Sequence, residues 1–394
     1  MYLKYGFLLL FIISLSIIPV SSIEAAVVSS SKLGIFILQP TAGGTSILNS
    51  GPRIISVFDP HKNANIVSMV RTYKSKFPQG QVIMRVYDGT QTLHYALTDD
   101  PAASALDYWT KALKPAYMAL PATDRSLFDY MSGPVEYNTT PKITSTAEAQ
   151  WVNAFWITLS DQMHQLGLKP NMGEIPVGNP DVSALNVVIP SLVPALQKIK
   201  LYGGFWSYHA YTINYTTDVG AEIWYSLRYR QVYTYLQQTY PDLATMPMVL
   251  TEAGVDQTGD PATSGWQARG DAAKYEAWLT WFDGQIKQDS YIIGATIFQS
   301  GDTYWSSFNT EPIAPWLETY ILNPNITNAP TPTISCTQKK DGDSNCDGLV
   351  NLADFEIFRK ENFSLLTTKT SDYNGDGAIS LLDYNIWRKT AYNI

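Results

Sequence analysis

Short apolar runs alternate with longer amphipathic stretches throughout residues 33–322, and this alternation limits the folds that the chain can adopt. Apolar runs of about four to eight residues are typical of buried strands, whereas stretches of about ten or more have the length of helices. We expect eight strands, at residues 33–38, 53–58, 81–87, 127–130, 169–175, 204–211, 248–251 and 292–299. We expect helices at residues 63–76, 103–118, 146–167, 185–200, 223–239 and 272–289.

The order of these elements predicts an α/β fold, a closed (β/α)8 TIM barrel over residues 27–322. Eight strands that alternate with helices fit a closed parallel barrel, whereas an open sheet usually has fewer strands and a glycine-rich nucleotide loop, which this sequence lacks. Gly167 follows the third predicted helix as a natural C-cap. Functional groups of such barrels lie at the carboxyl ends of the strands, so candidate residues are sought there.

Two glutamates stand at such strand ends. Glu136 follows the fourth predicted strand, and Glu252 follows the seventh. Paired carboxylates on opposite sides of a barrel mouth are what cleavage of a glycosidic bond requires, one as the acid and one at the anomeric carbon. Glu174 on the fifth predicted strand is an alternative acid, but counting its strand as the fourth removes one strand from the barrel. We therefore prefer Glu136.

The order of the motifs resembles the large clan of retaining (β/α)8 glycoside hydrolases. The Thr-Glu-Ala-Gly segment at Glu252 is similar to the clan's nucleophile motif, and residues 206–211 are similar to its sixth strand. Phe298-Gln299 followed by Trp305 is similar to its eighth strand. The resemblance implies a double displacement that retains the anomeric configuration, with Glu252 as the nucleophile and an acid/base after the fourth strand.

One position departs from the clan's pattern. The residue before the acid/base is normally Asn, which bonds the 2-hydroxyl of the sugar, and here it is Val135. Either Asn138 or another polar group replaces it, or the barrel has lost part of its catalytic apparatus. A catalytically silent carbohydrate-binding barrel is therefore kept as the alternative to a hydrolase, and a purely structural scaffold component as a third reading.

Further residues are predicted to contact the substrate or the nucleophile. Arg85 ends the third predicted strand, where its charge would hold Glu252 ionised, although it has Asp59 and Asp88 as other ion-pair partners. The aromatic rings of this set offer surfaces on which sugar rings can stack, and each is also a plausible core residue. The predicted substrate-binding residues are Arg85, Asn138, Glu174, Trp206, His209, Tyr211, Gln299 and Trp305.

The C-terminal residues contain the same 12-residue pattern twice, 29 residues apart. Oxygen donors at positions 1, 3, 5, 9 and 12, a carbonyl at position 7 and glycine at position 6 are the features of a calcium loop. Each loop leads directly into a matching helix. The predicted ligands are Asp343, Asn345, Asp347, Leu349, Asn351 and Asp354 in the first loop and Asp372, Asn374, Asp376, Ala378, Ser380 and Asp383 in the second.

Residues 341–394 resemble a type I dockerin, a small all-α module that binds a cohesin domain on a scaffold or surface protein. As in that family, position 12 of both loops is Asp, and basic pairs follow in the helices. The resemblance implies two calcium ions, none of them catalytic, and recognition of cohesin through residues 352–353 and 381–382. Because these pairs are apolar, the cohesin type stays open. A paired calcium fold that only caps the C-terminus is the alternative.

The two ends of the barrel region carry segments of different composition. Residues 1–26 combine Lys4, an apolar run over 7–20 and small residues near position 25, which is typical of a secretory signal peptide, and the run is short for a membrane span. Residues 323–340 are rich in Pro, Thr and Asn and predict an extended linker.

The sequence leaves the state of its two cysteines open. Cys336 and Cys346 either form a disulfide in a secreted protein or remain free thiols.

These features combine into one expectation about function. The formal net charge of −8 disfavours a nucleic-acid partner. We expect a secreted, extracellular retaining glycoside hydrolase that acts on a β-linked polysaccharide or oligosaccharide and is anchored to a cohesin-bearing scaffold.

Overall fold

The computed structural model describes residues 26–87, 90–324, 341–344, 350–362 and 370–392. The chain divides into two compact units, residues 1–326 and 327–394. The predicted signal peptide lies outside the described residues except for residue 26, and the predicted linker lies outside them except for residues 323 and 324. Cys336 and Cys346 also lie outside them.

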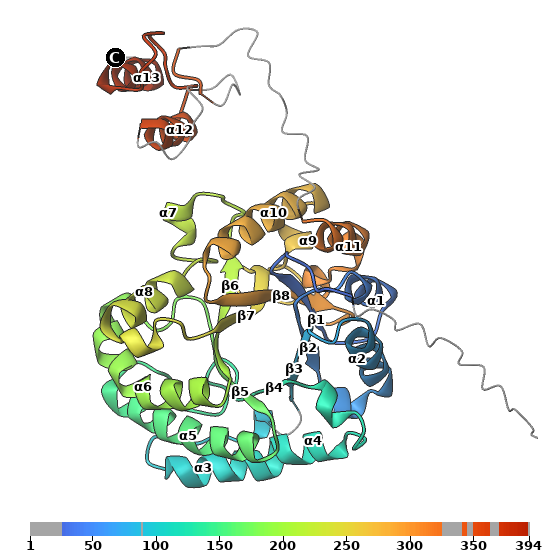
Figure 1. Cartoon of the computed structure of the whole chain (residues 1–394). Coiled ribbons are helices and arrows are strands. Elements are labelled where there is room, and N and C mark those ends of the chain that lie inside the picture. Colours follow the sequence, from blue (N-terminus) through green and yellow to red (C-terminus); the bar gives the residue numbers. More distant parts are fainter. Residues whose placement is uncertain (1–25, 88–89, 325–340, 345–349, 363–369, 393–394) are drawn as a thin grey trace, which may run out of the picture. The chain divides into compact units, whose positions relative to one another are not determined.

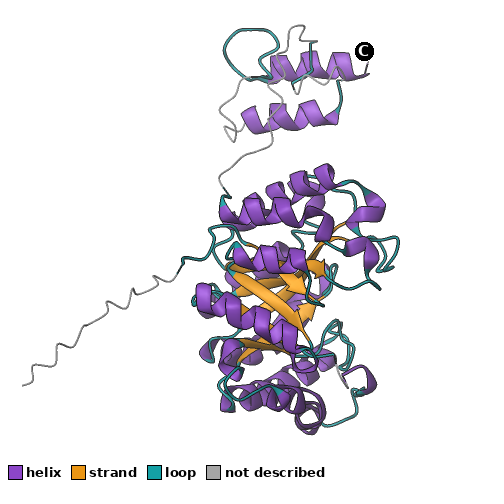
Figure 2. Ribbon diagram, turned by 90° about the vertical axis from the view of Figure 1, so that its right-hand side faces the viewer, coloured by secondary structure: helices purple, strands orange, loops and turns teal. Residues whose placement is uncertain are grey.

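The first unit is a closed barrel of eight parallel strands in sequence order, as predicted (Figure 1). Pairing of the first strand with the eighth, with Leu33 opposite Ala295, closes the ring. The helices surround the strands, and Figure 2 shows the strands enclosed by them. The strands are β1 (Leu33–Ile37), β2 (Ile54–Phe58), β3 (Gln81–Arg85), β4 (Tyr130–Ser132), β5 (Lys169–Ile175), β6 (Phe205–Thr212), β7 (Met248–Val255) and β8 (Ile292–Ser300).

Several helices of this unit begin at a residue whose side chain caps them. Ser145 and Asp271 accept hydrogen bonds from backbone N–H groups of the first turns of α5 and α10, which satisfies donors that a helix start leaves unpaired. The helices of this unit are α1 (Ala42–Asn49), α2 (Ala64–Lys76), α3 (Pro101–Tyr108), α4 (Lys114–Ala119), α5 (Thr146–Gln165), α6 (Leu185–Leu201), α7 (Val219–Glu222), α8 (Tyr229–Thr239), α9 (Trp266–Arg269), α10 (Ala272–Gln288) and α11 (Ala314–Leu322).

Several predicted elements have different bounds in the structure, among them β4, the predicted helix 103–118 and α8. β4 begins at Tyr130 rather than at residue 127, because Arg125–Leu127 form a 3-10 turn and the extended strand starts only after it. The predicted helix 103–118 is α3 and α4 joined by a π-helical stretch ahead of Pro115, which has no N–H to donate. α8 begins at Tyr229, six residues later than predicted.

Side chains of alternate strand residues divide into an inner and an outer layer. Ile54, Ile83, Tyr130, Phe205 and Val249 fill the barrel interior, and the larger apolar core lies between the strands and the helices. The residues that follow the interior cluster on each strand therefore approach the mouth of the barrel, where the candidate site lies.

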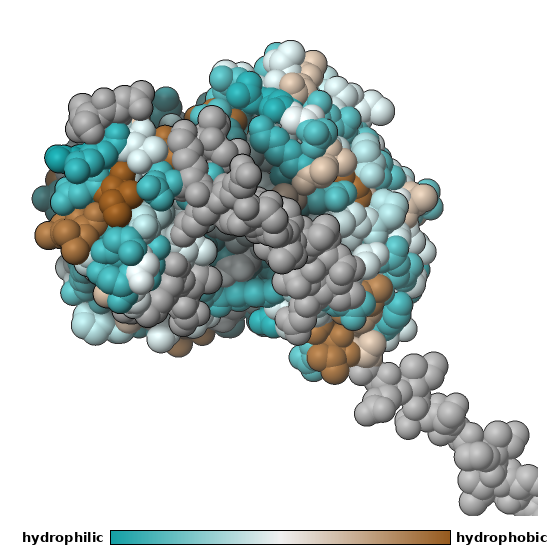
Figure 3. Space-filling view, turned by 90° about the horizontal axis from the view of Figure 1, so that it is seen from above, coloured by the Kyte–Doolittle hydropathy of each residue, from teal (hydrophilic) through white to brown (hydrophobic). Residues whose placement is uncertain are grey.

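One helical segment among the described residues, Val182–Leu201, is long and apolar enough to span a membrane by composition. It includes α6, whose inner face is buried in the core between strands and helices, so the same apolar residues have a packing role here. The face of the molecule seen in Figure 3 is largely hydrophilic and carries small, separate hydrophobic patches.

The described residues of the second unit include the helices α12 (Leu352–Asn362) and α13 (Leu381–Tyr392), whose first residues are 29 positions apart. Their aromatic rings pack together, with 4.8 Å between the ring centroids of Phe355 and Trp387 and 5.7 Å between those of Phe355 and Tyr384. The sequence repeat therefore reappears as two similar helices that share one small core.

Candidate active site

Glu252 projects into the barrel mouth because β7 carries a bulge. Side chains of a regular strand alternate, so Glu252 should share the outer face with Leu250, which packs in the helix-facing core. The pairing of β7 with both neighbouring strands, β6 and β8, shifts register around Thr251. One extra residue is therefore inserted in β7, and such a β-bulge reverses the alternation of the side chains that follow it. Glu252 consequently points inward, and the strand continues to Val255 instead of ending at residue 251.

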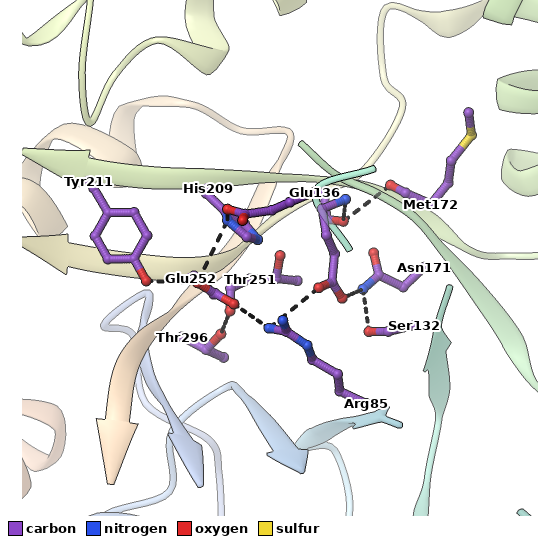
Figure 4. Close-up of polar contacts among 12 residues, drawn as sticks. Arg85, Ser132, Glu136, Asn171, Met172, His209, Tyr211, Thr251, Glu252 and Thr296 are labelled. Atoms are coloured by element: carbon purple, nitrogen blue, oxygen red, sulfur yellow. Dashed lines mark hydrogen bonds and ion pairs between the residues drawn. The ribbon is translucent and has the colours of Figure 1, made fainter. Parts of the chain in front are cut away.

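Each carboxylate oxygen of Glu252 accepts a hydrogen bond. Arg85 Nη1, from the end of β3, donates to Oε1, and the Tyr211 hydroxyl on β6 donates to Oε2 over 2.8 Å (Figure 4). Burial raises the pKa of Glu252, but the charges of His209 and Arg85 and these hydrogen bonds outweigh it and hold the pKa below its ordinary value. Glu252 is therefore an ionised carboxylate in a buried setting.

His209 connects the two glutamates that the sequence singled out. Its Nδ1 lies 2.8 Å from Glu136 Oε1 and 3.7 Å from Glu252 Oε2. The two oxygens are therefore no farther apart than the sum of these distances, about 6.5 Å. Burial lowers the pKa of His209, but the carboxylates of Glu252 and Glu136 raise it above its ordinary value overall.

Glu136 sits on a tight turn after β4. Glu136 and Tyr137 have φ angles of 49° and 63°, a left-handed conformation that is uncommon for residues other than glycine. The turn is fixed by a 3.2 Å hydrogen bond from Glu136 N to the Glu174 carbonyl oxygen and a 2.8 Å bond from Asn138 N to the Val135 carbonyl oxygen. The Glu136 side chain is 44% exposed, so it is the accessible member of the pair.

Glu174 is fully buried below the mouth. A register shift in β5 between Met172 and Ile175 turns it inward, as the bulge does for Glu252. Its Oε1 accepts a 2.9 Å hydrogen bond from Asn171, and its Oε2 lies 3.6 Å from Arg85 Nη1. Burial raises the pKa of Glu174 above its ordinary value. Because it does not line the cavity, it is poorly placed as the acid that the sequence offered as an alternative to Glu136.

A cavity of about 990 Å³ opens above these carboxylates, within the range of ligand sites. Four acidic residues line it, which are Glu136, Glu252, Asp256 and Asp302. Its aromatic lining comprises Phe36, Phe58, Tyr87, Tyr211, Trp224, Tyr225, Phe298, Tyr304, Trp305 and Phe308. A mouth that combines carboxylates with aromatic rings suits a polyhydroxylated ligand that also has apolar faces.

The predicted substrate-binding residues do not all reach this cavity. Arg85, Asn138, Tyr211 and Trp305 line it, and His209 contacts both glutamates from the barrel interior. The three others, Glu174, Trp206 and Gln299, are buried and do not line it.

Two of these placements correct the prediction of substrate contact. On β6, His209 and Tyr211 point to the inner face of the barrel, and Trp206, an odd number of residues before them, points to the opposite face. Trp206 therefore packs in the helix-facing core. Gln299 donates from Nε2 to the carbonyl oxygens of Asp302 and Trp305, at 2.9 and 3.0 Å, and so holds the loop after β8.

Several residues of the cavity were missed by the sequence argument. Phe36 and Phe58 lie near the carboxyl ends of β1 and β2, so the rule that identified Arg85 applies to them as well. Trp224 was hidden inside the predicted helix 223–239, which in the structure is a loop up to residue 228. For Phe36 and Phe58 the available signal was an aromatic side chain at a strand end, whereas Trp224 lies beyond α7 and carries no such signal.

The loops of the second unit repeat the same hydrogen bonds. The first-loop Asp354 carboxylate accepts bonds from Ser344 N and Asn351 N, at 2.8 and 2.9 Å. The second-loop Asp383 accepts them from Tyr373 N and Ser380 N at the same distances, and each donor lies 29 residues after its counterpart. The two loops therefore fold alike around their last predicted ligand.

The donor chemistry of the second loop fits calcium, since its side chains offer carboxylate, amide and hydroxyl oxygens. Gly377 at position 6 has a φ of 84°, which the sharp turn of such a loop requires. The Asp372 carboxylate accepts bonds from the backbone N–H groups of Asp376 and Gly377. No three His, Cys, Asp or Glu side chains among the described residues are gathered as a metal cluster. The predicted ligands Asn345, Asp347 and Leu349 lie outside those residues.

No protein-family model and no curated protein matches the chain. Solved structures with a similar fold include glycoside hydrolases. The mannanase catalytic domain from Streptomyces sp. SirexAA-E is 14% identical over 70% of this chain and 76% of its own, with a TM-score of 0.39. A GH5-4 broad-specificity endoglucanase from an uncultured bacterium is 14% identical over 72% and 86%, with a TM-score of 0.43. The β-mannanase from Streptomyces thermolilacinus is 15% identical over 75% and 90%, with a TM-score of 0.39. At these values the likeness concerns the barrel alone.

Replacing Arg85 with methionine should raise the pKa of Glu252, because a cation that is hydrogen-bonded to the carboxylate is removed. The pKa is to be measured from the pH dependence of the Glu252 carboxyl 13C chemical shift. A carboxylate whose pKa is lowered by folding stabilises the folded state above the ordinary glutamate pKa, and this stabilisation is lost as pH falls. The free energy of unfolding of Arg85→Met should therefore decrease less than that of the native protein when the pH is lowered. Arg71→Met, which removes a surface pair with Asp124, is the matched control. An unchanged Glu252 pKa in Arg85→Met contradicts the assigned geometry.

Proposed function

We propose that the barrel is a retaining glycoside hydrolase that acts on a β-linked polysaccharide or oligosaccharide. The observation that supports it most directly is the distance limit of about 6.5 Å between a Glu136 oxygen and a Glu252 oxygen, set by the shared His209 nitrogen. Carboxyl groups of retaining enzymes lie about 5–5.5 Å apart, whereas those of inverting enzymes lie about 6.5–9.5 Å apart to leave room for a water. For this pair of oxygens the limit includes the retaining distances and excludes nearly all of the inverting range, which supports a double displacement.

In the first step, the ionised Glu252 carboxylate attacks the anomeric carbon and forms a glycosyl ester. The bond between that carbon and the leaving oxygen breaks, and Glu136 gives its proton to the departing sugar hydroxyl. In the second step, Glu136 takes a proton from water as the water oxygen attacks the same carbon and releases Glu252. Two inversions at one carbon retain its configuration.

The surrounding residues suit these roles. Arg85 and Tyr211 each bind one oxygen of Glu252, which fixes the carboxylate and keeps it unprotonated for attack. His209 binds Glu136 and so orients the acid toward the cavity. The greater exposure of Glu136 suits a group that must exchange protons with water in each cycle.

A carbohydrate-binding barrel without turnover is the second candidate, and Val135 favours it. Val135 lines the cavity beside Glu136 and has no polar group for a sugar hydroxyl. Asn138 also lines the cavity, and its amide can supply the missing contact to the 2-hydroxyl. Hydrolysis is the discriminating observation, because binding is common to both candidates.

Glu252→Gln and Glu136→Gln should each reduce kcat by at least about 10³-fold on whichever glycan of a β-mannan, β-glucan and xylan panel the protein hydrolyses. Each change removes a charge or proton that the transition state needs, while the glycan should still bind in calorimetry. Glu276→Gln, on α10, serves as the control. Proton NMR of the first product should show the β-anomer. Glycan binding without any hydrolysis by the native protein, or an initial α-anomer, contradicts the proposal.

We propose further that the second unit is a calcium-dependent dockerin that attaches a secreted enzyme to a cohesin. The repeated loops and helices support this reading, and the side chains of Leu381 and Leu382, 76% and 60% exposed at the start of α13, offer an apolar surface for a partner. Asp372, Asn374, Asp376, Ser380 and Asp383, with the Ala378 carbonyl, would hold calcium in the second loop. The ion would fix the loop against α13 and take no part in hydrolysis.

Chelation of calcium with EDTA should unfold the second unit of the full-length protein and leave its hydrolysis rate unchanged, because the proposed ions bind only that unit. The helical circular dichroism signal and the rate are to be followed together. Asp383→Ala should reproduce part of the loss at saturating calcium, whereas Asn385→Ala, on the exposed side of α13, should not. Parallel loss of structure and hydrolysis on chelation contradicts the division of roles.

A further inference from the structure

Three aromatic side chains line the cavity and are nevertheless widely exposed. Trp224 is 55% exposed, Tyr87 is 48% exposed and Tyr304 is 70% exposed. Most other tryptophans and tyrosines of the barrel are packed in its cores. Large apolar rings kept at the edge of a cavity, instead of being buried, usually mark a surface that a ligand covers.

These rings stand on different sides of the mouth. Tyr87 follows β3 and Trp224 lies on the loop after β6, and these strands are three places apart in a closed ring of eight. Glu136, after β4, lies within the arc between them, and Glu252 rises from β7 beyond it. A ligand that touches both rings must therefore cross the mouth near the carboxylates.

The loop of Trp224 is fixed by a buried carboxylate that the proposed reaction does not use. Glu222 Oε1 accepts a 2.6 Å hydrogen bond from Thr212 Oγ1, at the end of β6. Its Oε2 accepts bonds from the Ser226 backbone N, over 3.1 Å, and from the Ser226 hydroxyl. Both ends of the loop are thereby held to the strand that carries His209 and Tyr211, which limits the freedom of Trp224 to fold inward.

A second contact supports the Trp224 ring. The guanidinium carbon of Arg228 lies 5.9 Å from the ring centroid, and Arg228 is itself buried and donates to the Pro180 carbonyl oxygen over 2.8 Å. The ring is therefore positioned before a ligand arrives, and less conformational freedom is lost when one binds.

We propose that Trp224 and Tyr87 are stacking sites for two different sugar units of one glycan chain, so that the barrel binds several units across its mouth and cleaves bonds inside the chain. This inference rests on the proposed hydrolase function and adds the chain length and the mode of attack. The C–H faces of a β-linked sugar pack on an aromatic ring while its hydroxyl groups stay hydrated. Gln257 and Thr258 line the same cavity and offer hydrogen bonds that an apolar protein partner would leave unused.

The test uses the full-length protein and β-linked oligosaccharides of two to six units, from whichever glycan it hydrolyses best. Trp224→Ala and Tyr87→Ala should each lower kcat/KM about tenfold on the hexasaccharide, with a loss that shrinks as the chain shortens. Trp224→Phe should restore much of the loss, because a ring remains. Leu201→Ala, at an apolar residue 79% exposed at the end of α6, is the control. The native protein should release oligosaccharides of mixed length from the polymer.

Two results overturn the inference and are distinguishable from failure of the proposed function. If the native protein hydrolyses glycans but both alanine variants lose the same factor at every chain length, the rings do not bind separate sugar units. Release of a single sugar as the only early product likewise excludes internal cleavage. If no glycan is hydrolysed, the proposed function fails, and the stacking sites are then tested alone by calorimetry of hexasaccharide binding. Binding to Trp224→Ala that is about tenfold weaker than binding to the native protein supports the stacking sites, and equal binding overturns them.

Discussion

One buried guanidinium holds the candidate site together. Arg85 bonds Glu252 and lies 3.6 Å from Glu174, so a single cation faces two carboxylates that the barrel interior has removed from water. Burial alone favours the neutral form of both acids. At Glu174 burial dominates and raises the pKa, whereas at Glu252 the charge of His209, the charge of Arg85 and the direct Arg85 bond outweigh burial and lower the pKa. This asymmetry gives the site one ionised carboxylate instead of two neutral acids.

The barrel supplies the geometry that this electrostatic arrangement needs. Closure of the sheet brings the carboxyl ends of β3, β6 and β7 to one ring, and alternation along β6 places His209 and Tyr211 on the inner face. Bulges in β5 and β7 reverse the alternation and turn Glu174 and Glu252 inward. The inward position of these two carboxylates thus depends on local departures from regular strands, within a fold that is otherwise regular.

The barrel and the strand-end position of both glutamates were predictable from the sequence, because apolar runs and their order report burial and connectivity directly. The bulges were not, since an extra strand residue leaves no mark in the composition of its neighbours. Trp206 was grouped with His209 although regular alternation along β6 sends it to the opposite face, so the sequence was sufficient to exclude it. The loop at Trp224 was also missed, because its fixed form comes from the long-range bond between Glu222 and Thr212.

Trapping the glycosyl intermediate tests the central assignment most directly. The native protein is to be incubated with an activated 2-deoxy-2-fluoro-β-glycoside of the sugar it hydrolyses, digested, and analysed by tandem mass spectrometry. The proposed chemistry predicts one added fluoroglycosyl group, attached to the carboxylate of Glu252. Attachment to Glu174 or Glu136, or continued hydrolysis without any covalent adduct, contradicts it.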